Sequence, residues 1–127
     1  MALTQLNHVT IRTDDLDATR DFYQDLLGLK AGPRPPLGFP GYWLYADEAA
    51  VVHLVPQTNA IGGGSSPDTG NFDHIAFTAE GFDEIRDRLR RHGIKFHEQV
   101  VPETPIRQLF FQDPNRVMVE LNFPSGN

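Results

Sequence analysis

The chain has 127 residues, a formal net charge of −6 at pH 7 and no cysteine. The negative charge argues against nucleic-acid binding, which needs clustered lysine and arginine side chains, and the lack of cysteine excludes disulfides and thiol chemistry. No apolar run approaches the roughly 20 residues of a membrane-spanning helix, and the N-terminus shows no charged-then-apolar signal pattern. We therefore expect one cytoplasmic domain, residues 1–127, that neither enters membranes nor binds nucleic acid.

The first element expected is a β-strand over residues 4–13, where side chains alternate in character. The alternation places His8 and Arg12 on one, more polar face. It places Asn7, Val9 and Ile11 on the other face, where the two aliphatic side chains can pack on a helix.

An amphipathic helix should follow, starting after Asp14 or Asp15 and ending at about Leu27, before Gly28. A strand is expected at the start of residues 29–42, and the proline and glycine content of this segment predicts an irregular loop for most of the rest. This part of the chain is unusually aromatic, with Phe39, Tyr42 and Trp43. The aromatic side chains either pin the loop to the core or line a pocket beneath it.

The rest of the chain repeats this order of elements. The first half is completed by strands at 43–46 and 51–55, and glycine-rich residues from about 57 to 70 form a linker. The second half is expected to contain a strand at 72–78, a helix at about 82–92, and strands at 96–101, 106–112 and 117–123. Each half is thus a βαβββ module, the first over residues 4–56 and the second over residues 71–123, which makes the fold α+β.

The polar residues that fall inside apolar strands follow the same repeat. His8 and His74 are 66 positions apart, and His53 and Glu120 are 67 apart. A shared period of about half the chain indicates a duplicated module. If the modules pack with pseudo-twofold symmetry, the four side chains converge.

Such a group has the composition of a metal site. A glutamate between two apolar strand residues is costly to bury unless it is paired or binds a metal. Imidazoles together with a carboxylate suit one divalent ion of zinc, nickel, cobalt, manganese or iron. Each histidine alone could equally be a buried, hydrogen-bonded side chain; the common period favours the metal site. His92 and His97 have no repeat partner, and we expect structural roles for them.

The chain resembles the vicinal oxygen chelate superfamily, also called the glyoxalase, bleomycin resistance protein and extradiol dioxygenase family. The resemblance spans about residues 4–123 and is carried by the segments LNHVTI, RDFYQDLLGLK, DHIAF and FFQDPNRVMVELNFP. It implies that the two tandem modules curl into a cupped, incomplete β-barrel with helices outside. It also implies a metal inside the cup, with open positions for two neighbouring substrate oxygens.

The resemblance also implies roles for individual residues. His8, His74 and Glu120 match the family's metal ligands, and Glu120 is also a candidate base. His53 stands where two family members differ: glyoxalase I has a glutamate there and methylmalonyl-CoA epimerase a glutamine. It is therefore a fourth ligand, a catalytic acid or base, or only a pocket residue. Four further residues are candidates for substrate contact, two arginines for an anionic group and two aromatic residues for the pocket wall: Arg12, Arg107, Phe39 and Trp43.

The implied function is a metal-dependent enzyme for a small substrate with vicinal oxygens. The reaction expected is that of a glyoxalase-like isomerase or lyase, or an epimerase, with an enolate stabilised by Lewis-acid catalysis. One alternative is an Fe(II) dioxygenase of the extradiol type. Another is a non-catalytic protein that binds a small molecule such as an antibiotic. Small members of the family usually form homodimers, so a homodimer is expected.

Overall fold

The computed structural model describes residues 2–58, 69–113 and 117–127. The first half contains β1 (Ala2–Thr13), α1 (Leu16–Leu27), β2 (Lys30–Gly32), β3 (Tyr42–Ala46) and β4 (Ala49–Pro56). The second half contains β5 (Phe72–Glu80), α2 (Phe82–Arg91), β6 (His97–Val100), β7 (Arg107–Gln112) and β8 (Met118–Phe123). The predicted α+β class and the two βαβββ modules are confirmed. Most of the predicted linker lies outside the described residues, as do residues 114–116.

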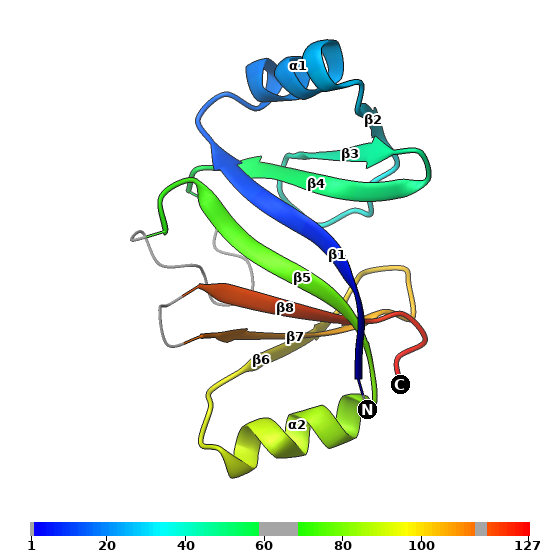
Figure 1. Cartoon of the computed structure of the whole chain (residues 1–127), viewed down its shortest axis with the longest axis vertical. Helices are drawn as coiled ribbons and strands as arrows, with labels where there is room; N and C mark the ends of the chain where they lie inside the picture. Colours follow the sequence, from blue (N-terminus) through cyan, green and yellow to red (C-terminus); the bar gives the residue numbers. More distant parts are fainter. Residues whose placement is uncertain (1, 59–68, 114–116) are drawn as a thin grey trace.

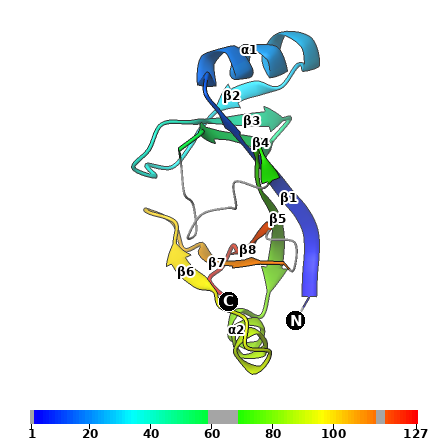
Figure 2. The same cartoon turned by 90° about the vertical axis from the view of Figure 1, so that its left-hand side faces the viewer.

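The strands form a sheet of eight in the order β2-β3-β4-β1-β5-β8-β7-β6 (Figure 1). The two modules meet at the antiparallel pair β1–β5, and each of these strands also pairs in parallel with the last strand of its own module, β4 or β8. Figure 2 shows that the sheet curves around one open side, with a helix beyond each end. This is the predicted cupped, incomplete barrel.

The first module packs its helix against the outer face of the sheet. The side chain of Asp15 accepts a hydrogen bond from the backbone N–H of Ala18 and so caps α1. Gly28 ends the helix with φ 76°, a left-handed conformation that glycine adopts at little cost. Beneath α1, Leu44, Val52 and Leu54 form a buried apolar cluster with neighbours from β1 and the helix.

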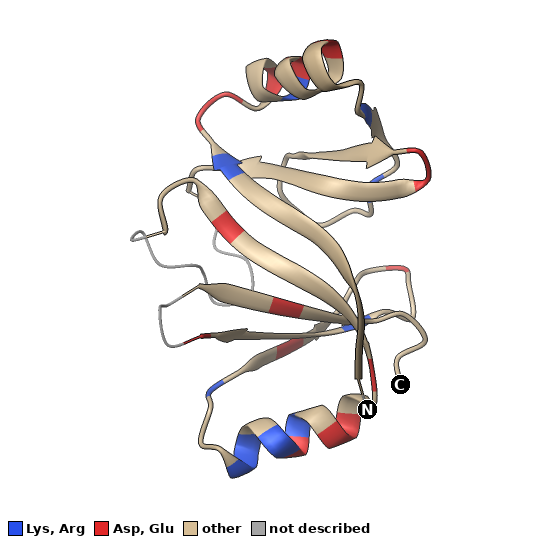
Figure 3. Cartoon of the chain, viewed as in Figure 1, with Lys and Arg blue, Asp and Glu red and all other residues tan. Residues whose placement is uncertain are grey.

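The second module has the better-buried helix. Phe82, Ile85 and Leu89 of α2 are buried against Leu109, Leu121 and Phe123 of the sheet. The exposed residues of α2 are charged: acidic residues stand in its first turn and arginines in its last turn (Figure 3). Several of them form ion pairs along the helix. In the parts of the chain that the structure describes, no helix is long and apolar enough to cross a membrane.

Candidate metal centre and cavity

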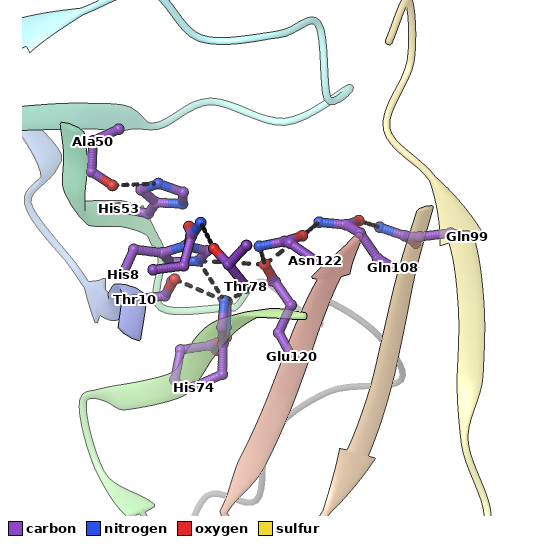
Figure 4. A network of polar contacts seen from close by, with 12 residues as sticks. His8, Thr10, Ala50, His53, His74, Thr78, Gln99, Gln108, Glu120 and Asn122 are labelled. Carbon is purple, nitrogen blue, oxygen red and sulfur yellow. Dashed lines mark hydrogen bonds and ion pairs between the residues drawn. The ribbon is translucent and has the colours of Figure 1, made fainter. Parts of the chain in front are cut away.

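Strand register brings three candidate ligands together at the centre of the sheet. In the β1–β5 pair, Thr10 lies opposite His74 and His8 opposite Ala76, and in the β5–β8 pair Ala76 lies opposite Glu120. Direct and diagonal neighbours across paired strands share one face of a sheet. His8, His74 and Glu120 therefore converge within one chain on the concave face (Figure 4).

The three side chains have the spacing of a metal-ligand set. His74 Nε2 lies 3.0 Å from Glu120 Oε1 and 3.2 Å from His8 Nε2, and His8 Nε2 lies 3.6 Å from Glu120 Oε2. Ligand atoms about 2.0–2.1 Å from a tetrahedral ion are roughly 3.3 Å apart. All three residues are at most 4% exposed. Two imidazoles and one carboxylate at these distances fit a divalent metal ion.

Each imidazole is oriented by a hydrogen bond to the side chain of the residue that precedes it in the sequence. His74 Nδ1–H donates to Asp73 Oδ2 at 2.6 Å, and His8 Nδ1–H donates to Asn7 Oδ1 at 2.7 Å. Asn7 and Asp73 are 66 positions apart, so the outer partners follow the repeat too. Hydrogen bonds of this kind fix the tautomer and leave Nε2 free to bind a metal.

The position of Asn7 differs from the prediction. Simple alternation puts this residue on the helix side of β1, but its side chain lines the cavity on the concave side. The pairing of β1 with β5 shifts register between Leu6 and His8. A bulge of this kind re-aims side chains and breaks the period of two.

The electrostatics of the cluster are those of a buried ion pair. Burial favours the neutral forms of His74 and Glu120, but their mutual contacts outweigh it. Together with the bond to Asp73, these contacts raise the pKa of His74 to about 9, and they lower the pKa of Glu120 to about 2. Burial lowers the pKa of His8 to about 4. At pH 7 His8 is thus neutral and Glu120 ionised, whereas His74 carries an extra proton that a metal ion would displace.

His53 lies beside this cluster but is not part of it in the structure. Its ring stacks on the His8 ring, with centroids 3.6 Å apart, and on the Trp43 ring at 4.1 Å. Its Nε2–H donates to the carbonyl of Ala50 at 3.1 Å, which turns that nitrogen away from the cluster (Figure 4). Burial lowers the pKa of His53 to about 2, so the ring is neutral at pH 7. Its role as a fourth ligand stays a prediction.

A chain of carboxamides fixes the other side of Glu120. Asn122 Nδ2 donates to Glu120 Oε2 at 2.6 Å, Gln108 Nε2 donates to Asn122 Oδ1 at 2.8 Å, and Gln99 Nε2 donates to Gln108 Oε1 at 2.8 Å (Figure 4). Each amide thus has its donor end directed toward the carboxylate. The chain runs from the edge strand β6 across β7 to β8, stabilises the ionised form of Glu120 and holds Oε2 while Oε1 faces His74.

The cluster lies in the wall of a cavity of about 1100 Å³. The cavity is bounded by the loop between β2 and β3 and by the segment from β6 to β7, which extend on the same side of the sheet (Figure 2). Phe39 and Trp43 line it, as predicted, and Phe110 does so as well. Tyr42 does not: its hydroxyl donates to Asp17 Oδ1 at 2.5 Å, on the α1 side of the sheet.

Neither arginine predicted to bind substrate lines the cavity. Arg12 Nη2 donates to the carbonyl of Gly70 at 2.6 Å, and its Nε lies 3.5 Å from Asp73 Oδ1. Arg107 lies over the ring of Phe82, with its guanidinium carbon 3.4 Å from the ring centroid. Both guanidinium groups are engaged within the fold, so their positions do not support substrate contact.

The sequence interpretation did not give functional roles to several residues that the structure places at the site. Asn7 and Asp73 were visible as the residue before each histidine in the repeated motif. Asn122 was visible two residues after Glu120, on the same strand face. Arg34 lines the cavity from the predicted loop, and no periodic pattern marks a loop residue.

The family model described as the Glyoxalase/Bleomycin resistance protein/Dioxygenase superfamily matches residues 5–121. The chain belongs to this superfamily. Among curated relatives, the chain is 32% identical to glyoxylase I 4 of Arabidopsis thaliana, over 94% of this chain and 70% of that protein. It is 27% identical to the glutathione transferase FosA of Serratia marcescens, over 97% of this chain and 83% of that protein.

Solved structures show the same fold. Methylmalonyl-CoA epimerase from Streptomyces coelicolor, in complex with 2-nitronate-propionyl-CoA, superposes with a TM-score of 0.67 at 23% identity and covers 98% of this chain and 99% of that chain. A Mn(II)-bound glyoxalase from Novosphingobium aromaticivorans superposes with a TM-score of 0.70 at 24% identity, over 97% of this chain and 40% of that chain.

Proposed function

We propose that this chain is a metal-dependent enzyme that acts on a small substrate with two neighbouring oxygen atoms, in a glyoxalase-like isomerase or lyase reaction or an epimerisation. The observation that carries the proposal is the buried convergence of His8, His74 and Glu120 in the wall of a cavity large enough for a small molecule. The similarity to glyoxylase I 4 supports the same class of reaction.

The chain's own residues have separate roles in this proposal. His8, His74 and Glu120 hold one divalent ion, through two imidazole nitrogens and a carboxylate oxygen. The ion supplies a Lewis acid that stabilises negative charge developing on the substrate oxygens. Asp73 and Asn7 keep the imidazoles oriented, and the cavity walls shield the reacting atoms from bulk water.

Proton movement is assigned to Glu120 and His53. In the metal-free centre Glu120 carries no proton at pH 7, because its contacts with His74, His8 and Asn122 outweigh burial and lower its pKa to about 2. His53 is neutral, and with Nε2–H donating to Ala50 its other ring nitrogen is a hydrogen-bond acceptor. We assign Glu120 as the base and His53 as its helper.

The ligand set also favours a second candidate. Two histidines and one carboxylate are the donors that hold Fe(II) in non-haem oxygenases. An Fe(II) extradiol-type dioxygenase would therefore use the same three residues. A homodimer in the cytoplasm remains the expected setting for either enzyme.

A proton-exchange experiment tests the main proposal. The protein is loaded with each candidate metal in D2O and mixed with a hemithioacetal of a 2-oxoaldehyde or with a 2-methylmalonyl thioester. Deuterium entering the carbon next to the carbonyl is followed by NMR. We expect exchange in the wild type, about a hundredfold slower exchange in Glu120→Gln, and unchanged exchange in His92→Ala, whose exposed ring forms a hydrogen bond with the carbonyl of Arg88 in its own helix.

Two other results would decide against the proposal. Oxygen uptake with a catechol by the Fe(II)-loaded protein, without exchange, would select the dioxygenase. No exchange and no oxygen uptake with any metal, while the substrates still bind, would leave a non-catalytic binding protein.

A further inference from the structure

Arg34 supplies positive charge to the cavity wall at a place separate from the histidines of the candidate metal centre. It lies in the loop between β2 and β3, and among the described residues around the cavity it is the one arginine, with no lysine beside it. The same cavity contains the candidate metal ligands. A substrate held there would therefore meet a guanidinium group as well as the metal centre.

The loop is built to hold this guanidinium in place. Arg34 Nη2 donates to the carbonyl of Phe39 at 2.9 Å, and the guanidinium carbon lies 4.9 Å from the centre of the Phe39 ring. Gly41 leaves the necessary room, because a Cβ there would lie 3.0 Å from Arg34 Nη2 and 2.4 Å from the carbonyl oxygen of Leu54. Pro33 and Pro35, on either side of the arginine, restrict the backbone. An arginine held in this way loses little entropy when it binds a ligand.

Within the described residues, Arg34 has no acidic partner. No carboxylate of the described chain forms an ion pair with it, whereas Arg20, Arg86 and Arg90 each contact a neighbouring aspartate. Its Nε is buried without a hydrogen-bond partner. Three acidic residues line the cavity. Glu120 is paired with His74 in the candidate metal centre, and Glu48 and Glu103 are exposed to solvent, which screens their charge. Arg34 thus contributes to the cavity wall a positive charge with which no carboxylate of the described chain forms an ion pair.

We propose that Arg34 binds an anionic oxygen group of the substrate, a carboxylate or a phosphate, while the vicinal oxygens of the same molecule lie at the cluster of His8, His74 and Glu120. Planar guanidinium groups match such anions in geometry as well as charge. The inference rests on the proposed function and narrows its substrate class to small molecules with a negatively charged end.

Hydroxamates test the inference because their two neighbouring oxygens bind divalent metals. The probes are alkyl hydroxamates of several chain lengths, each made with a carboxylate, a phosphonate or a neutral carboxamide at the far end. Binding to the metal-loaded protein is measured by titration calorimetry. At the best chain length we expect one charged tail to bind about tenfold or more tightly than the neutral tail of equal length, the gain typical of one charge-assisted hydrogen bond.

Variants of Arg34 separate ligand binding from loop structure. Arg34→Met keeps most of the aliphatic stem and should abolish the preference for a charged tail while the neutral probe binds as before. Arg34→Lys should keep part of the preference. A preference that is absent in the wild type, or that survives in Arg34→Met, would overturn the inference and leave the metal site standing. Failure of every probe, the neutral ones included, would contradict the metal site itself, and this inference with it.

Discussion

Replacing Asp73 by asparagine should weaken metal binding without changing any candidate ligand. The Asp73 side chain is fully buried, and its Oδ2 accepts from His74 Nδ1–H at 2.6 Å. The substitution makes the second module resemble the first, where Asn7 already serves His8. It removes a charge-assisted hydrogen bond but keeps a carbonyl oxygen of similar size.

The expected loss of metal affinity is about 10- to 100-fold, the range found when an outer partner of a metal-binding histidine is removed. That range corresponds to about 1.4–2.7 kcal/mol of binding free energy. Asp73 Oδ1 also lies 3.5 Å from Arg12 Nε, so a loss of folding stability of about 1–3 kcal/mol is expected as well.

Competition with a fluorescent chelator at fixed pH measures the affinity, and urea unfolding of the metal-free protein measures the stability. Asp47→Asn is the control: it makes the same change at an exposed turn residue, where φ is 54° and asparagine is tolerated. A folded Asp73→Asn protein whose metal affinity lies within threefold of the wild type would refute the reasoning.

Three further predictions follow from the same structure. Metal affinity should rise about tenfold per pH unit between pH 5 and 8, with about one proton released per ion, because His74 has a pKa of about 9 whereas His8 and Glu120 have pKa values of about 4 and 2. Calorimetry in buffers of different ionisation enthalpy counts the released protons, and a count near zero or two would contradict the prediction. Asn122→Leu should lower metal affinity several-fold, because Glu120 Oε2 loses its 2.6 Å donor; an unchanged affinity in the same competition assay would show that the carboxamide chain does not position Glu120. Gly28→Ala should cost about 1 kcal/mol of unfolding free energy, since φ is 76° there; no change in the urea midpoint would contradict the strain argument.

The repeat in the sequence predicted most of the fold. Paired positions such as His8 and His74 indicated two modules because independent residues rarely share one long period. Where a strand limit differed, the difference was one or two residues, which is the usual uncertainty at element ends. The order of the strands in the sheet is a tertiary property, and in the sequence only the resemblance indicated how the two modules join.

The candidate site was predicted less completely. The sequence indicated that His8, His74 and Glu120 belong together, and their convergence follows from register at the β1–β5 and β5–β8 pairs. It did not indicate that His53 turns its Nε2 to Ala50, because side-chain rotamers depend on neighbours such as Trp43 that packing brings close. The sequence also did not indicate that Arg12 lies outside the cavity, where its Nη2 donates to the carbonyl of Gly70 and its Nε lies 3.5 Å from Asp73 Oδ1.

The most direct measurement is the metal content of protein purified without added metal and without a histidine tag. The wild type, Glu120→Ala and the control His92→Ala would be compared by elemental analysis, before and after challenge with zinc, nickel, cobalt, manganese and iron. The centre of His8, His74 and Glu120 predicts about one equivalent of metal in the wild type and in His92→Ala, and little in Glu120→Ala. A wild-type protein that holds no metal after challenge with every ion, or an unchanged metal content in Glu120→Ala, would contradict it.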